Sequence, residues 1–209
     1  MTGSDRPGTV NDLLLAALHV AIDGRNQEHG ATAQKIGTMV PINMRPEERR
    51  QEVMANLLLP VRVVTNRSHR ATPGRVQETV RAQTRRFKEM DSGAALIELL
   101  NRSPALPLGA KEALSPLLWL TGNRLVDTAM LSNLGRLERP PTFGPEAGDT
   151  TEVWFSAPAR IPLGLSLGAV TVAGRLHLAF RYRHALLDHE AAARFADRYL
   201  SVLMSMVSQ

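Results

Sequence analysis

The stretch "GLSLGAVTVAGRLHLAFRYRHALLDHEAAARFADRYLSVL" (164–203) carries most of the information about the fold. It contains two apolar runs, and the dipeptide at 173–174 between them is typical of a tight turn. The pattern predicts a β-hairpin with strands over 162–172 and 175–183. Apolar residues then return at helical spacing over 188–205, and they are Ala192, Phe195, Ala196, Tyr199, Leu200 and Leu203. The chain is therefore expected to end in two paired strands and an amphipathic helix.

Upstream of this stretch, the hydrophobic pattern predicts four helices and four strands. The helices are expected over 9–27, 72–91, 92–101 and 109–122. The strands are expected over 35–45, 56–66, 127–137 and 151–158. The sequence therefore predicts an α/β fold with a mixed β-sheet of about five or six strands covered by helices.

Helix-capping residues, prolines and glycines refine these boundaries. Thr9, followed by Asp12, is expected to cap the first helix. Pro60 places the strand 56–66 at an edge or bulge of the sheet, since proline cannot donate to a β-ladder. The strand 127–137 is expected to run out at Asn133 and Gly135, before the loop 138–150. We expect residues 1–8 to be flexible and residues 9–205 to form one domain.

The composition of the 209 residues excludes several classes of function. There is no cysteine, which rules out disulfides and thiol nucleophiles. The net charge of +5 comes mostly from arginines interleaved with acids, and aromatic residues make up only 4%, so we expect no nucleic-acid partner. No histidine pair has zinc-ligand spacing beside a carboxylate, so no metal is expected. The apolar runs predict neither a signal peptide nor a membrane span, and the expected location is the cytoplasm.

The order of several segments resembles the C-terminal lobe of CoA-dependent acyltransferases. These segments are "TVNDLLLAAL" (9–18), "MVPINMR" (39–45), Asn56 after a charged loop, "LSNLGRL" (131–137), "TFGPEAGD" (142–149) and the stretch 164–203. The pattern is similar to wax ester synthase/diacylglycerol acyltransferase proteins and to the condensation domains of nonribosomal peptide synthetases. The resemblance covers nearly the whole chain, although no single motif in it is strict.

This resemblance implies half of a two-lobed enzyme with a chloramphenicol acetyltransferase-like fold in each lobe. Complete members look like a V with a tunnel between the lobes, and their catalytic H-H-x-x-x-D-G lies in the first lobe. No such motif occurs in this sequence. The expected partners are therefore an N-terminal catalytic lobe or a second copy of the chain, with an acyl or peptidyl carrier protein as a further partner. No bound cofactor is expected; acyl-CoA or a phosphopantetheinyl carrier thioester would be the co-substrate.

The segment "RHALLD" (183–188) contains an H-x-x-x-D motif near the C-terminus, as chloramphenicol acetyltransferase and dihydrolipoyl acyltransferases do. By this resemblance His184 would be a general base and Asp188 its structural neighbour. Two residues depart from the pattern, because His189 replaces the glycine after the aspartate and Arg183 precedes His184. The alternative is a relic of the motif, in which Asp188 only caps the last helix.

Three further residues are candidates for substrate contact. Ser132 and Asn133 end a strand where the related enzymes face their tunnel, and Asn56 lies at the start of another strand; a structural role is the alternative for each. The loop 138–150 resembles the segment that bridges the lobes.

Three hypotheses about function remain open. The chain would be the C-terminal lobe of an acyltransferase, forming one wall of its tunnel. Alternatively, it would be a self-sufficient oligomeric acetyltransferase that uses His184, or a non-catalytic module that binds carrier proteins.

Overall fold

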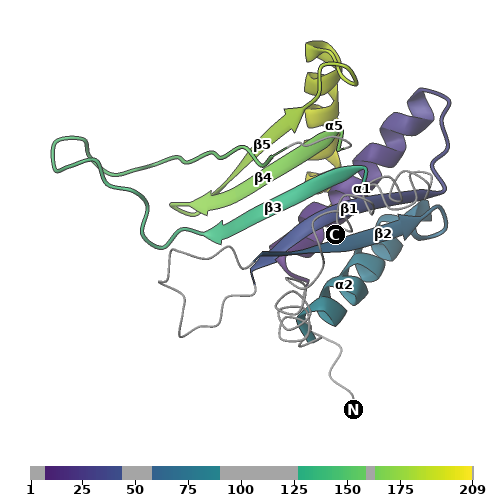
Figure 1. Cartoon of the computed structure of the whole chain (residues 1–209), viewed down its shortest axis with the longest axis horizontal. Coiled ribbons are helices and arrows are strands. Elements are labelled where there is room, and N and C mark those ends of the chain that lie inside the picture. Colours follow the sequence, from purple (N-terminus) through teal and green to yellow (C-terminus); the bar gives the residue numbers. More distant parts are fainter. Residues whose placement is uncertain (1–7, 44–57, 90–126, 159–162, 209) are drawn as a thin grey trace, which may run out of the picture.

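The fold is a five-stranded sheet in the order β2-β1-β3-β4-β5 with helices packed on it (Figure 1). The computed structural model of the chain describes residues 8–43, 58–89, 127–158 and 163–208. Its elements are α1 (Val10–Glu28), β1 (Lys35–Asn43), β2 (Leu58–Asn66), η2 (His69–Ala71), α2 (Pro73–Glu89), β3 (Ala129–Arg136), β4 (Leu165–Val172), β5 (Arg175–Tyr182) and α5 (His189–Val207). The predicted α/β class with a mixed sheet is confirmed.

Helix α1 begins with the predicted cap. The Thr9 hydroxyl accepts from the Asp12 backbone N–H at 3.3 Å, while the Asp12 carboxylate accepts from the Thr9 backbone N–H at 2.8 Å. This capping box satisfies two backbone donors that the first turn would otherwise leave open. The helix then buries a continuous run from Leu14 to His19, so it lies deep in the protein rather than on its surface.

The strand register follows from the turns and the prolines. Strands β1, β3 and β4 are parallel to one another, whereas β2 pairs antiparallel with β1 and β5 pairs antiparallel with β4. Pro60 lies on β2 at the edge of the sheet, as predicted. The β4–β5 hairpin turns through Ala173 (φ +47°) and Gly174 (φ +75°), and two successive residues with positive φ are typical of a type I′ turn.

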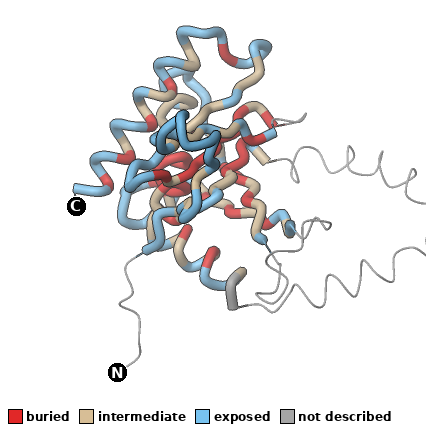
Figure 2. The backbone as a smooth tube through the Cα atoms, turned by 90° about the vertical axis from the view of Figure 1, so that its left-hand side faces the viewer, coloured by how far each residue is buried: buried red, intermediate tan, exposed pale blue. Residues whose placement is uncertain are grey.

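The core lies between one face of the sheet and helices α1, α2 and α5 (Figures 1 and 2). Leu131 and Leu167 project into it from the central strands, and both are completely buried. Phe180 from β5 makes edge-to-face contacts with Phe195 and Tyr199 of α5, with ring centroids 5.8 and 5.2 Å apart. This packing holds the C-terminal helix against the sheet, as the apolar face of 188–205 indicates.

The opposite face of the sheet is crossed by residues 151–158, which we call the strap. The prediction of a β-strand over these residues was wrong, because the structure has no ladder there. The strap is held on β4 by a hydrogen bond, which Ser166 Oγ donates to the Ala157 carbonyl at 2.8 Å. It also approaches β4 closely at Gly168, where a Cβ would lie only 2.5 Å from the Phe155 carbonyl oxygen. Burial nevertheless alternates along the strap, because Val153 and Phe155 are half-buried and Ala157 is buried while the residues between them are exposed.

Two smaller predictions also differ from the structure. Strand β3 does not end at Asn133 but continues to Arg136, through a register break at which Gly135 adopts φ +73°. Leu200 does not face the core, because it lies on the solvent side of α5. The helices predicted over 92–101 and 109–122 lie outside the described residues, as do residues 1–7 of the expected flexible terminus.

Candidate functional site

The H-x-x-x-D segment forms a turn between β5 and α5. The Leu186 and Leu187 N–H groups donate to the Arg183 carbonyl at 2.9 and 3.0 Å, and the buried Leu187 anchors the turn to the core. His184 is exposed, and its ring lies 5.3 Å from that of Tyr182, centroid to centroid. The turn therefore presents His184 to solvent.

Asp188 is the N-cap of α5, and its Oδ1 accepts from the Ala191 N–H at 2.7 Å. Within the described part of the chain, no hydrogen bond or ion pair joins Asp188 to His184. His189, at the position of the expected glycine, is the first residue of the helix and has no positive φ. The chain thus enters α5 directly, and the geometry of this segment is that of a helix cap.

Ser132 and Asn133 lie near the carboxyl end of β3, where the strand register breaks. Ser132 pairs with Gly168 and shares the strap-side face of the sheet with Met130, two residues away. The Asn133 side-chain oxygen accepts from the Gly135 N–H at 2.9 Å, so it shapes the local turn. Asn56, the third candidate, lies outside the described residues.

The long connection from β3 to β4 contains the exposed loop 138–150, which projects beyond the sheet in Figure 1. We call this loop the arm. Phe143 within it is 77% exposed, and Trp154 in the strap that follows is 59% exposed. The Trp154 ring contacts His177 edge to face at 5.3 Å and so lies over β5. Large aromatic side chains exposed on one connection are typical of a contact surface.

The strap-side face combines an apolar patch with an ion pair. Met130, Ala157 and Leu163 are buried there, with Met39 and Phe155 packed against them. Beside them Arg62 Nε pairs with Asp127 Oδ1 at 2.5 Å, directly above Gly37. Burial raises the pKa of Asp127, and the nearby Arg62 guanidinium partly opposes this rise. Sequence patterns did not identify this pair, since the two residues are 65 positions apart.

The described residues contain no cluster of three or more His, Asp or Glu side chains that could hold a metal ion. In the same ranges, no helix has both the length and the apolar character that a membrane span requires.

Comparison with known proteins gives matches in two strains of one organism. The uncharacterized protein Rv2305 of Mycobacterium tuberculosis is 34% identical over 199 residues, which is 94% of this chain but 46% of the relative. A protein of a second strain of this organism, MT2362, matches equally well. The chain thus spans about half the length of the curated relatives it matches. No protein-family model matches the chain.

Several solved structures resemble the chain, and among them are domains of peptide synthetases and a wax ester synthase. The epimerization domain from the third module of tyrocidine synthetase B superposes with a TM-score of 0.59 at 18% identity, covering 96% of this chain and 42% of that one. The starter condensation domain of rhizomide synthetase gives 0.54 at 14% identity, covering 95% and 41%. The wax ester synthase/diacylglycerol acyltransferase from Marinobacter aquaeolei VT8 gives 0.52 at 12% identity, covering 95% and 43%.

These superpositions define the fold. The chain has the fold of one half of a condensation-type domain, which the wax ester synthase also contains. The resemblance seen in the sequence is therefore confirmed at the level of fold.

Proposed function

We propose that the chain is the C-terminal lobe of a condensation/acyltransferase-type enzyme. In this proposal it helps to transfer an acyl group from a CoA or carrier-protein thioester to a hydroxyl or amine acceptor. The observation that carries the proposal is the exposure of Phe143 and Trp154 on a connection that projects from a half-domain fold. In this proposal the part of the relative that the match leaves uncovered packs on this surface.

The chemistry divides between the two halves. Acyl transfer needs a base that takes a proton from the attacking hydroxyl or amine, and hydrogen-bond donors that stabilise the oxyanion. We assign the base to the other half, because Asp188 is engaged at the helix cap and His184 is exposed in a turn. This chain would provide one tunnel wall on the strap side of the sheet, where Met130 is buried beneath the strap and supports it from below.

Of the three candidates for substrate contact, we retain Ser132. Its position on the strap-side face supports a contact with the substrate, whereas the Asn133 side chain is already engaged in a turn. Carrier-protein binding would bring the thioester to the tunnel that the two halves form.

The proposal is tested by complementation. The 209-residue chain is co-purified with the part of the Mycobacterium relative that its match leaves uncovered, and release of free thiol from acyl-CoA is measured with alcohol and amine acceptors. We expect turnover by the pair and none by either part alone. His184→Ala should leave the turnover of the pair unchanged.

Three outcomes contradict the proposal. Turnover by the isolated chain that is abolished by His184→Ala would indicate the self-sufficient acetyltransferase instead. A pair that binds carrier proteins without turnover would indicate the non-catalytic module. Absence of any association between the two parts would remove the basis of the proposal.

A variant pair tests the role of Asp188 separately. Because its carboxylate caps α5, Asp188→Ala should lower the free energy of unfolding by about 1 kcal/mol, while Asp188→Asn should retain most of it. Neither change should abolish turnover by the pair. Loss of turnover in Asp188→Asn, at unchanged stability measured by urea denaturation, would assign Asp188 to the catalytic machinery.

A further inference from the structure

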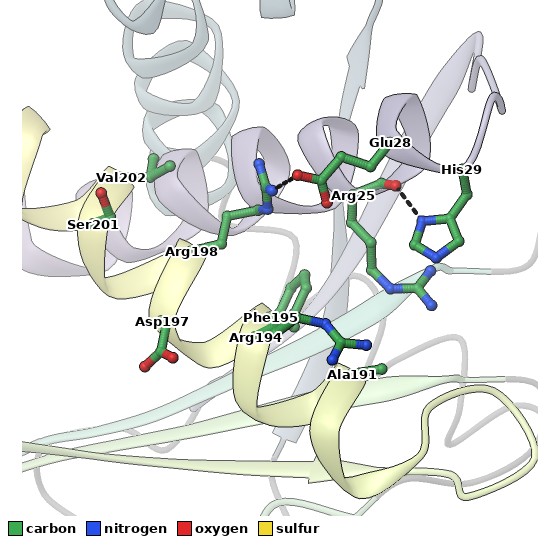
Figure 3. Close-up of a pocket in the computed structure, with 10 residues that line it drawn as sticks. All are labelled: Arg25, Glu28, His29, Ala191, Arg194, Phe195, Asp197, Arg198, Ser201 and Val202. Carbon is green, nitrogen blue, oxygen red and sulfur yellow. Dashed lines mark hydrogen bonds and ion pairs between the residues drawn. The ribbon is translucent and has the colours of Figure 1, made fainter.

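A concave site lies on the helical side of the molecule, away from the strap. Helices α1 and α5 diverge there, and a groove of about 550 Å³ opens between the last turn of α1 and the N-terminal half of α5 (Figure 3). Phe195, which is almost fully buried, lies between the walls, and Val202 lines one end. Figure 3 shows Arg25 and His29 extending from α1 and Arg194 from α5 toward the same open space.

The arginines in this groove differ in how far they are neutralised. Arg198 forms an ion pair with Glu28 across the two helices. Arg194 is 3.4 Å from Glu190, but both side chains are highly exposed, and such a pair contributes little. Among the described residues, no acidic group forms an ion pair with Arg25. Positive charge therefore accumulates between Arg25 and Arg194.

The other titratable groups of the groove, His29 and Asp197, do not neutralise the positive charge of Arg25 and Arg194. The His29 Nδ1 lies 2.9 Å from the Arg25 carbonyl oxygen, which can only accept, so Nδ1 carries the proton and Nε2 is left for another partner. Asp197 is the remaining acid of the groove, and Figure 3 shows its carboxylate directed away from Arg25 and His29. The groove thus presents two arginine side chains, Arg25 and Arg194, from two walls.

We propose that this groove binds a phosphate dianion, either inorganic phosphate or the phosphate monoester of an organic molecule. The planar guanidinium groups of Arg25 and Arg194 match the geometry of phosphate oxygens, which they would hold from opposite walls. The apolar surface of Phe195 and Val202 would contact the organic part of a monoester. The proposal is independent of acyl transfer, since it uses no residue of the strap-side face.

Isothermal titration calorimetry on the whole 209-residue chain tests the proposal. Inorganic phosphate and adenosine 5′-monophosphate are titrated at constant ionic strength, with sodium chloride as the salt control. We expect saturable binding of phosphate, weakened by about tenfold or more in the double variant Arg25→Gln/Arg194→Gln, because both charge-assisted contacts are removed. The matched control is Arg75→Gln/Arg85→Gln, which removes the same charge from two exposed arginines of α2 and should bind as the unmodified chain does.

A second variant keeps the test decisive if the double variant fails to fold. Ala191→Glu adds a carboxylate to the groove wall and should likewise weaken binding. Tighter binding of the nucleotide than of phosphate identifies an organic phosphate as the ligand, and equal binding identifies free phosphate. The proposal would be overturned if neither phosphate nor the nucleotide bound beyond the salt control, if binding were unchanged in both groove variants, or if the α2 control weakened it equally.

Discussion

At the scale of single residues, His19 shows how strongly burial changes an ionisable group. Its ring is fully buried between α1 and β2, and its Nδ1 lies 2.7 Å from Thr65 Oγ1. Loss of hydration and, to a lesser extent, the positive charge of Arg70 lower the pKa of His19 from 6.5 to about 3. Arg70 itself is held by Asp23, with Nε and Oδ1 3.1 Å apart. His19 is therefore neutral in the folded protein at neutral and mildly acidic pH.

This lowered pKa predicts a loss of stability in mild acid. Between pH 6.5 and about 3 the unfolded chain binds a proton at His19 that the folded chain does not, so the free energy of unfolding falls as the pH falls. One such group contributes a slope of up to about 1.4 kcal/mol per pH unit. His19→Asn, which can keep the bond to Thr65, should flatten the dependence measured by urea denaturation between pH 4 and 6.5. His184→Asn, at an exposed histidine, serves as the control and should leave the slope unchanged.

At the scale of elements, helix α2 protects the free edge of β2. The Gln83 side chain accepts from the Val64 N–H at 2.9 Å and donates to the Val64 carbonyl at 2.8 Å. Strand β2 is at the edge of the sheet, so this amide satisfies backbone groups that another strand could otherwise pair with. A side chain from a neighbouring helix thus does what a further strand would do.

Removal of this amide should weaken the protein and open its edge. Gln83→Leu leaves two backbone groups of Val64 without their partner, and we expect a loss of about 1–3 kcal/mol in urea denaturation, with increased light scattering. Gln83→Glu keeps the acceptor and loses the donor, so its stability should lie between that of the unmodified chain and that of Gln83→Leu. If Gln83→Leu were as stable and as monodisperse as the unmodified chain, water would bind the two Val64 backbone groups equally well and the prediction would be wrong.

The same scale shows what sequence patterns can and cannot predict. Helix α1, the β4–β5 hairpin and the Asp188 cap depend on local signals, and each was predicted. The strand predicted over 151–158 is absent because a hydrophobic pattern indicates which residues are buried, not whether the backbone has a ladder partner. The Gln83 contact and the Arg25–Arg194 groove join residues far apart in the sequence, so no local pattern could indicate them. Among the candidate site residues, the capping role of Asp188 could be predicted from the sequence, whereas the ring contact of His184 with Tyr182 could not.

At the scale of the whole molecule, two surfaces have different characters. The helical face carries the charged groove between α1 and α5, whereas the connection across the other face exposes Phe143 and Trp154. An apolar surface of this kind is covered by a partner in the proposed function, and the isolated chain has only other copies of itself to cover it. The state of association of the isolated chain is therefore a consequence of the proposal.

We predict that the isolated chain self-associates through the arm and strap. Burial of two large aromatic side chains contributes about 1.5–3 kcal/mol each, so Phe143→Ser/Trp154→Ser should weaken association by tenfold or more in sedimentation velocity, with little change in the unfolding midpoint. Leu200→Ser/Met204→Ser, at two exposed apolar residues of α5, is the matched control and should associate as the unmodified chain does. Addition of the complementary part of the Mycobacterium relative should dissociate these oligomers, because that part and a second copy of the chain compete for the same surface. If the α5 control weakened association and the arm variant did not, the contact surface would lie on the helical face and the proposed lobe interface would be wrong.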